Sequence, residues 1–170
     1  RNLGFLQDEP SDVLVVEFFG DGDAEIASLL DRLKFRLKQS RLGYAVTTLT
    51  EMADQAKVWE MRRAGLGLMM NVSGDAKPIP FVEDTAVPVQ RLPEYVKRFD
   101  EIVKSHGTEA GYYGHASVGC LHIRPIVNLK LRKGNDRMES IASSISDLVL
   151  EFGGSMSAEH GDGIVRGVWT

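Results

Sequence analysis

Segments with the pattern of β-strands alternate along the chain with segments that have the pattern of α-helices, and their order limits the possible folds. Strands are short runs rich in β-branched and aromatic residues, whereas helices carry apolar residues three and four positions apart. Strands are predicted over 13–19, 44–49, 81–87, 111–115, 120–127 and 155–159. Helices are predicted over 24–40 and 52–70, around 95–103 before His106-Gly107, and around 138–152 before Gly153-Gly154. A loop is predicted over 71–80.

The resulting order is β-α-β-α-β-α-β-β-α-β, with two βαβ-like units and a hairpin between 111–115 and 120–127. This order predicts an α+β fold, in which an antiparallel or mixed sheet carries its helices on one face. The length of 170 residues fits a single domain over 1–170.

Charge and cysteine content exclude several classes of protein. Twenty Lys and Arg against 24 Asp and Glu give a net charge of −4 at pH 7, which argues against nucleic acid as the main partner. Cys120 is the single cysteine, so no disulfide forms within the chain and a reducing, cytoplasmic compartment is favoured. No apolar run reaches the roughly 20 residues that cross a bilayer, so any attachment to the inner membrane is expected to be peripheral.

The glycine pair at Gly20-Asp21-Gly22 follows a predicted strand and precedes a predicted helix, as a dinucleotide-binding loop would. No glycine follows three residues after Gly22, and the aspartates would repel a pyrophosphate. We interpret this segment as a tight turn with Asp23 as the helix N-cap. The chain therefore shows no phosphate-binding loop of its own.

Three of the four histidines lie in two short glycine-containing segments. His115 and His122 would point to opposite faces of one continuous strand, but a turn at 117–119 lets both imidazoles meet near the closed end of a hairpin. Two imidazoles and the carboxylate of Glu159 are a suitable ligand set for a divalent metal. The residues alone leave open that each histidine is an ordinary buried or surface residue.

His160 follows Glu159 directly, and adjacent side chains are expected to diverge. We therefore expect His160 to lie beside the metal as a general base, a role that imidazole side chains commonly fill near neutral pH. The alternative is a histidine that makes only local hydrogen bonds in a glycine turn. His106 is expected only to end a helix.

Cationic side chains could bind an anionic substrate. Arg62 and Arg63 follow Trp59 on a predicted helix, Lys77 lies in the loop after it, and Arg124 points to the same strand face as His122. An arginine can bind a carboxylate through two parallel hydrogen bonds. The alternative is that these charges are simply solvated.

Two separated motifs carry a resemblance to a known family. Gly-His-Ala-Ser-Val-Gly-Cys-Leu-His-Ile-Arg-Pro at 114–125 and Ser-Ala-Glu-His-Gly-Asp-Gly at 157–163 are similar to the FAD-linked oxidase C-terminal domain. Val-Trp-Glu-Met-Arg at 58–62 and Phe-Val-Glu-Asp-Thr-Ala-Val-Pro at 81–88 extend the similarity over nearly the whole chain. This family forms the substrate-side or cap domain of flavoproteins related to vanillyl-alcohol oxidase, D-lactate dehydrogenase, glycolate oxidase and D-2-hydroxyglutarate dehydrogenase.

The resemblance implies a ferredoxin-like α+β fold and a set of roles by position. It implies that His115, His122 and Glu159 bind a divalent cation (Zn, Mn or Fe) and that His160 is the catalytic base. It also implies that Arg62 and Lys77 contact the substrate carboxylate. FAD would be bound by a domain that precedes residue 1, so the chain would be an excised fragment, inactive alone.

The sequence departs from the common family pattern at several positions. Ser117, Val118 and Cys120 replace Gly, Asp and Asn between the two histidines, and Arg124 replaces an asparagine. This variant most resembles large forms in which the flavin module works with an iron–sulfur module as electron acceptor. The metal ligands are retained, whereas the substrate pocket is altered.

The leading hypothesis is a domain of a flavin-dependent 2-hydroxyacid dehydrogenase or oxidase of the D-lactate, glycolate or D-2-hydroxyglutarate type. Hydride would pass from the α-carbon to FAD. One alternative is a metal-dependent hydrolase that uses the same histidine and glutamate cluster. Another is a ferredoxin-like binding module without chemistry.

Overall fold

The computed structural model describes residues 4–169, except for the side chains of Leu66 and Leu68. The chain forms two compact units, Arg1–Gly65 and Leu66–Thr170, and each is described by itself. None of the described helices is both long and apolar enough to span a bilayer.

The first unit is helical, with α1 at Asp23–Ser40 and most of α2, which spans Met52–Met70. Both predicted helices are confirmed. The predicted cap is wrong, because Gly22 occupies the N-cap position and Asp23 is already helical. Asp23 and Glu25 instead lie in the first turn, where negative charge interacts favourably with the helix dipole.

The strands predicted over 13–19 and 44–49 are wrong, since within residues 4–169 neither segment forms a strand. A strand is stable only when a neighbouring strand pairs with its backbone groups, and sequence composition does not supply that neighbour. Large apolar side chains in both segments are exposed, among them Leu14, Phe19 and Tyr44.

The second unit contains the sheet and two long helices. Its elements are β1 (Lys77–Pro78), β2 (Thr85–Ala86), η1 (Val89–Arg91), α3 (Leu92–Ser105), β3 (Ala110–His115), η2 (Ala116–Val118), β4 (Cys120–Val127), α4 (Arg132–Glu151) and α5 (Gly163–Arg166). The predicted hairpin and both predicted helices of this unit are confirmed.

β4 is the centre of the sheet. It pairs antiparallel with β3 along one side, and with β1 and β2 at its two ends. Ser155 then bridges Ala86 in antiparallel fashion. Counted from β2, the order is strand-helix-strand-strand-helix-strand, and Ser155 at the last strand position lies beside β2. This is the ferredoxin-like arrangement. The α+β fold class is therefore confirmed.

Two strand predictions and one loop prediction differ from the structure. The strand expected over 81–87 is limited to β2, and the loop expected over 71–80 contains β1. The strand expected over 155–159 is reduced to the bridge at Ser155, because the following backbone turns to donate its N–H groups to Asp84.

The hairpin turn between β3 and β4 requires a glycine. Gly119 has a φ of 72°, and a Cβ there would lie 2.0 Å from the carbonyl oxygen of Val87. Only glycine combines this left-handed conformation with such a close backbone approach. The turn fixes the register of β3 against β4 and therefore which side chains meet across them.

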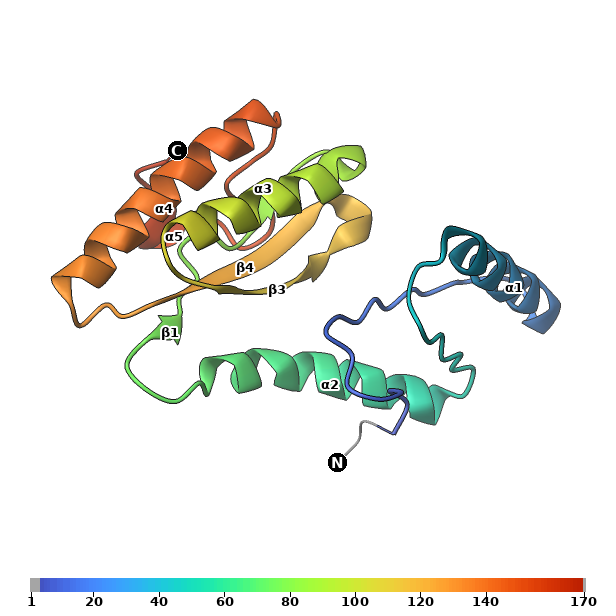
Figure 1. Cartoon of the computed structure of the whole chain (residues 1–170). Coiled ribbons are helices and arrows are strands. Elements are labelled where there is room, and N and C mark those ends of the chain that lie inside the picture. The colour runs from blue at the N-terminus through green and yellow to red at the C-terminus, as the bar shows by residue number, and fades with distance from the viewer. Residues whose placement is uncertain (1–3, 170) are drawn as a thin grey trace. The chain divides into compact units, whose positions relative to one another are not determined.

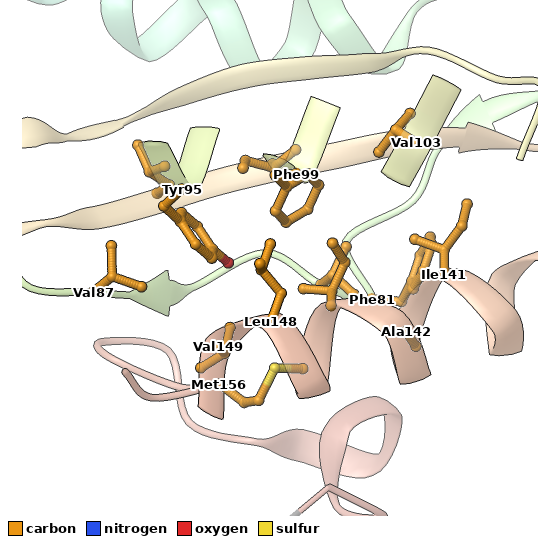
Figure 2. Packing of buried hydrophobic residues seen from close by; sticks show 14 of the residues in the cluster. Phe81, Val87, Tyr95, Phe99, Val103, Ile141, Ala142, Leu148, Val149 and Met156 are labelled. Carbon is orange, nitrogen blue, oxygen red and sulfur yellow. The ribbon is translucent and has the colours of Figure 1, made fainter. Parts of the chain in front are cut away.

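Helices α3 and α4 cover the same face of the sheet (Figure 1). Figure 2 shows apolar side chains of α3 and α4 facing each other, with Phe81 and Val87 in the same buried layer. From β4 this layer receives Leu121, Ile123 and Val127. Burial of each large apolar side chain contributes roughly 1.5–3 kcal/mol. The helices thus leave the opposite face of β4 to other chemistry.

Candidate metal and substrate site

The face of β4 away from the core carries polar side chains. Residues alternate between the two faces of a strand, so Cys120, His122 and Arg124 point away from α3 and α4. In the β3–β4 register Tyr113 lies opposite His122, and His115 lies opposite Cys120. Residues directly opposite each other share a face. The hairpin therefore brings His115 and His122 together, with ring centroids 5.5 Å apart.

Asp84 brings the C-terminal motif to this face. Its side chain is fully buried, and it accepts the backbone N–H groups of Ala158, Glu159 and His160 at 2.8–3.1 Å. The Ser157 hydroxyl donates to the same carboxylate at 3.1 Å. One carboxylate thus determines the path of four consecutive residues, the first three of which the sequence pattern predicts to be in a strand.

The protonation state of Asp84 follows from these contacts. Burial alone would raise the pKa of its carboxyl group, but the N–H groups of His160 and Glu159 and the other donors stabilise the charged form. The net effect is a pKa below the ordinary value. The guanidinium of Arg166, 3.8 Å away, adds a compensating charge.

Three imidazoles surround one oxygen of Glu159. Its Oε2 atom lies 3.4 Å from Nε2 of His122, 3.7 Å from Nε2 of His115 and 3.9 Å from Nε2 of His160. Two ligands bound to zinc at about 2.1 Å and at a tetrahedral angle lie about 3.4 Å apart. The spacing of these donor atoms is therefore close to that of ligands around one cation.

The expectation that Glu159 and His160 diverge is not met. Asp84, His122, Glu159 and His160 each offer a ligand atom within 4.8 Å of the others. The neighbours converge because the backbone at 157–160 is a loop around Asp84 and does not have the alternation of a strand. Nε2 of His160 lies 3.9 Å from Oε2 of Glu159, the same oxygen that His115 and His122 approach.

The protonation state of His122 is suited to a metal ligand. Burial, followed by the nearby His160, lowers its pKa below the ordinary value, which favours the neutral ring that binds metals. Its Nδ1 atom is buried and has no hydrogen-bond partner among the described residues. An unpaired buried nitrogen costs free energy, and such groups call for an explanation such as a functional role.

Arg124 is engaged within the protein. Its guanidinium pairs with the Glu83 carboxylate and donates to the Tyr113 hydroxyl at 3.2 Å. The other oxygen of Glu83 lies 3.2 Å from Nδ1 of His160. The predicted substrate cation and the predicted base thus share one buried carboxylate, which the sequence reasoning did not consider.

Arg62 and Lys77, the two other cations that the family resemblance assigns to the substrate, have contacts of their own. Arg62 belongs to the first unit, where its guanidinium lies 5.9 Å from the Trp59 ring centroid. Lys77 donates to the Val72 carbonyl, and it pairs with Val127 at the end of β4 farthest from the hairpin turn.

Sequence reasoning missed Glu83, Asp84 and Arg166. The signal was present, because two adjacent acidic residues interrupt an apolar run, and a buried polar residue is more informative than a buried apolar one. Arg166 donates to the carbonyl oxygens of Glu83 and Gly161. Nothing in its own sequence neighbourhood distinguished it from a solvated arginine.

Neither Cys120 nor His106 is one of the four clustered donors, although the Cys120 thiol lies 3.9 Å from Oδ1 of Asp84. Burial, followed by the charges of Glu159 and Asp84, raises the pKa of the Cys120 thiol to about 11, so the thiol stays protonated at neutral pH. His106 ends α3, as predicted, and its ring bonds the carbonyl of Ile102 and the hydroxyl of Ser140.

Comparison with known proteins identifies a family over almost the whole chain. The family model described as FAD linked oxidases, C-terminal domain, matches residues 3–170. D-2-hydroxyglutarate dehydrogenase of Pantoea ananatis is 36% identical over 154 residues, which are 88% of this chain and 15% of the relative. D-lactate dehydrogenase of Archaeoglobus fulgidus is 30% identical over 131 residues, or 77% of this chain and 28% of the relative.

Glycolate oxidase subunit GlcD of Bacillus subtilis is 27% identical over 126 residues, which are 73% of this chain and 26% of the relative. The chain thus spans between 15% and 28% of the length of these three relatives.

Proposed function

Because the chain belongs to the family of FAD-linked oxidase C-terminal domains, we propose that it is the substrate-side domain of a larger flavin-dependent 2-hydroxyacid dehydrogenase or oxidase. The names of its relatives support a substrate such as D-2-hydroxyglutarate, D-lactate or glycolate. The FAD-binding domain would precede this chain in the same protein. An iron–sulfur module is the proposed electron acceptor.

We further propose that His115, His122 and Glu159 bind a divalent cation, namely Zn, Mn or Fe. The observation that carries this proposal is the approach of the His122 and His115 Nε2 atoms to one Glu159 oxygen, at 3.4 and 3.7 Å. Imidazole and carboxylate donors suit each of these metals. When bound, the cation would fix and polarise the hydroxyl and carboxylate of the substrate.

The open side of the cluster suits a small substrate. The side chains of His115, Glu159 and His160 are each between 38% and 44% exposed, whereas His122 beneath them is buried. A 2-hydroxyacid could therefore reach the donor atoms from solvent, while the buried residues keep the cluster in place. Bound FAD would accept the hydride that leaves the α-carbon.

His160 is the proposed base that takes the hydroxyl proton. Its ring is accessible and lies beside the proposed metal ligands, as a base within reach of a bound hydroxyl must. Arg62 and Lys77 remain proposed contacts of the substrate carboxylate on the strength of the family resemblance. Arg124 is the weakest of the three proposed anchors, because its charge is already paired with Glu83.

Metal titration and flavin reduction test this function together. We expect the chain to bind one Co²⁺ or Zn²⁺ ion, and we expect His115→Ala and His122→Ala to abolish that binding. In the full-length flavoprotein both variants should also lose flavin reduction by 2-hydroxyacids. His160→Ala should retain the metal and reduce the flavin about 10²–10⁴-fold more slowly.

His106→Ala is the matched control, because this histidine bonds only to α3 and α4 in the described contacts. It should change neither metal content nor flavin reduction. Metal binding without flavin reduction by any 2-hydroxyacid would favour a metal-dependent hydrolase instead. Absence of both would leave a binding module without chemistry.

A further inference from the structure

The Glu83 carboxylate has two partners, one on each oxygen. Oε1 lies 3.2 Å from Nδ1 of His160, and Oε2 pairs with the Arg124 guanidinium. The Glu83 side chain is 11% exposed, so water is largely excluded from these contacts. A carboxylate in this position can order both of its partners.

The contact with Glu83 defines which nitrogen of His160 carries the proton. An ionised carboxylate only accepts hydrogen bonds, and a neutral imidazole has one N–H donor. Nδ1 must therefore be the donor to Glu83, which leaves the lone pair on Nε2. The Oε2 atom of Glu159 is 3.9 Å from Nε2, which is too far for a hydrogen bond.

Other contacts hold both members of this pair. The Glu83 carbonyl accepts a hydrogen bond from Arg166 at 2.7 Å, and the His160 N–H donates to Asp84 at 2.8 Å. The His160 ring stacks on His122 with centroids 4.6 Å apart and an interplanar angle of 11°. The ring is thus restrained at its backbone, at one face and at one edge, while the side chain as a whole remains 44% exposed.

Arg124 is placed to hold Glu83. Its side chain is 9% exposed, and arginine is a donor only. The guanidinium donates to Glu83 and to the Tyr113 hydroxyl, and its Cζ atom lies 5.8 Å from the Tyr113 ring centroid. A cation already neutralised and enclosed in this way is poorly suited to bind a substrate carboxylate as well.

We infer that Glu83 is a positioning residue that fixes the tautomer and orientation of His160, and that Arg124 acts by holding Glu83. The inference rests on the proposed role of His160 as base, because a base needs a bare nitrogen directed at the substrate. The arrangement parallels the carboxylate that orients the histidine of a serine protease triad. Glu83 thereby has a function in orienting His160, and Arg124 is assigned to holding Glu83 in place of binding the substrate.

The direct test is the tautomer of His160, measured by long-range ¹⁵N–¹H correlation NMR on the metal-free 170-residue chain with labelled histidine. We expect Nδ1–H in the unaltered chain. In Glu83→Gln the donor-only Arg124 would take the amide oxygen, so the amide NH₂ would face His160 and shift the proton to Nε2. Glu101→Gln, an exposed exchange on α3, should leave the Nδ1–H signal unchanged.

Kinetics in the full-length flavoprotein separate positioning from substrate binding. Glu83→Gln should lower kcat by about 10²–10⁴-fold, because a wrong tautomer removes the base, with KM changed less than threefold. If Arg124 acts by holding Glu83, Arg124→Lys should also lower kcat with little change in KM. If Arg124 instead binds the substrate, the same variant should mainly raise KM.

Each outcome decides the inference. An Nε2–H signal in the unaltered chain, or an unchanged tautomer in Glu83→Gln, would overturn it. A rise in KM alone for Arg124→Lys would return that residue to the substrate. If no 2-hydroxyacid reduces the flavin of the unaltered protein but the tautomer results hold, the proposed function fails while the role of Glu83 in orienting His160 stands.

Discussion

The side chains on the two faces of β4 are similarly buried, but those on one face are apolar and most of those on the other are polar. Towards α3 and α4, Leu121, Ile123 and Val127 are 9%, 0% and 1% exposed. On the other face Cys120, His122 and Arg124 are 2%, 2% and 8% exposed. The first set lies in a layer of apolar contacts, whereas the second is surrounded by carboxylates, imidazoles and a phenol.

The difference shows how one strand can serve stability and chemistry together. Apolar burial stabilises the fold without any need for specific partners. Buried polar groups stabilise it only when each is paired, and on the polar face the pairing is incomplete. Within the described residues Nδ1 of His122 and Nε of Arg124 have no hydrogen-bond partner. We therefore expect substitutions on the two faces to act in different ways.

The largest effect is expected at Asp84, which contacts the polar face of β4 at Cys120 and holds the loop at 157–160 in place. Asp84→Asn should lower the free energy of unfolding by about 4 kcal/mol, since it removes a buried charge that several N–H groups and Arg166 share. Asparagine tolerates the positive φ of 79° at this position, so the exchange tests the charge and not the backbone. Urea denaturation measures the change.

The pH dependence provides a check on this prediction. Because the folded-state pKa of Asp84 is lowered, its stabilising effect is complete above its unfolded pKa of about 3.9. The stability should fall as the pH drops from about 5 towards the folded-state pKa. Asp84→Asn should show a weaker decline over this range, and an equally steep decline would mean that Asp84 is not the group responsible.

A somewhat smaller effect is expected on the apolar face. Ile123→Ala should lower the free energy of unfolding by about 3 kcal/mol, because it leaves a cavity in a closely packed layer. Ile123→Val, which removes one methylene, should cost about 1 kcal/mol. Both variants should bind Co²⁺ as tightly as the unaltered chain while they remain folded. A loss of metal affinity in folded Ile123→Val would show that the two faces are not independent.

The smallest change in stability is expected for His122→Leu. The exchange removes an unpaired buried nitrogen and replaces it with an apolar group, so the free energy of unfolding should change by less than about 1 kcal/mol. Metal binding should nevertheless be lost completely, as a titration with Co²⁺ would show. A destabilisation as large as that of Ile123→Ala would mean that the polar face stabilises the fold as much as the core does.

Sequence patterns identified elements well wherever local information was enough. The bounds of α2 and β4 agree with the predicted ranges, because a helix satisfies its own backbone and β4 belongs to a hairpin that a short turn closes. The segments 13–19 and 44–49 have equally strand-like composition, yet they form no strand in the described structure. Their pairing depends on distant residues, about which composition carries no information.

The sequence by itself predicted a hairpin whose turn lets His115 and His122 meet, because strand patterns and a short turn are local properties, and the β3–β4 register then places both on one face. Only the tertiary structure decided the place of Glu159 and His160, since both depend on Asp84, 75 and 76 residues earlier in the chain. It likewise decided that Glu83 stands between His160 and Arg124. The physical reason is that a loop without a periodic pattern follows the hydrogen-bond donors and acceptors that the folded chain brings to it.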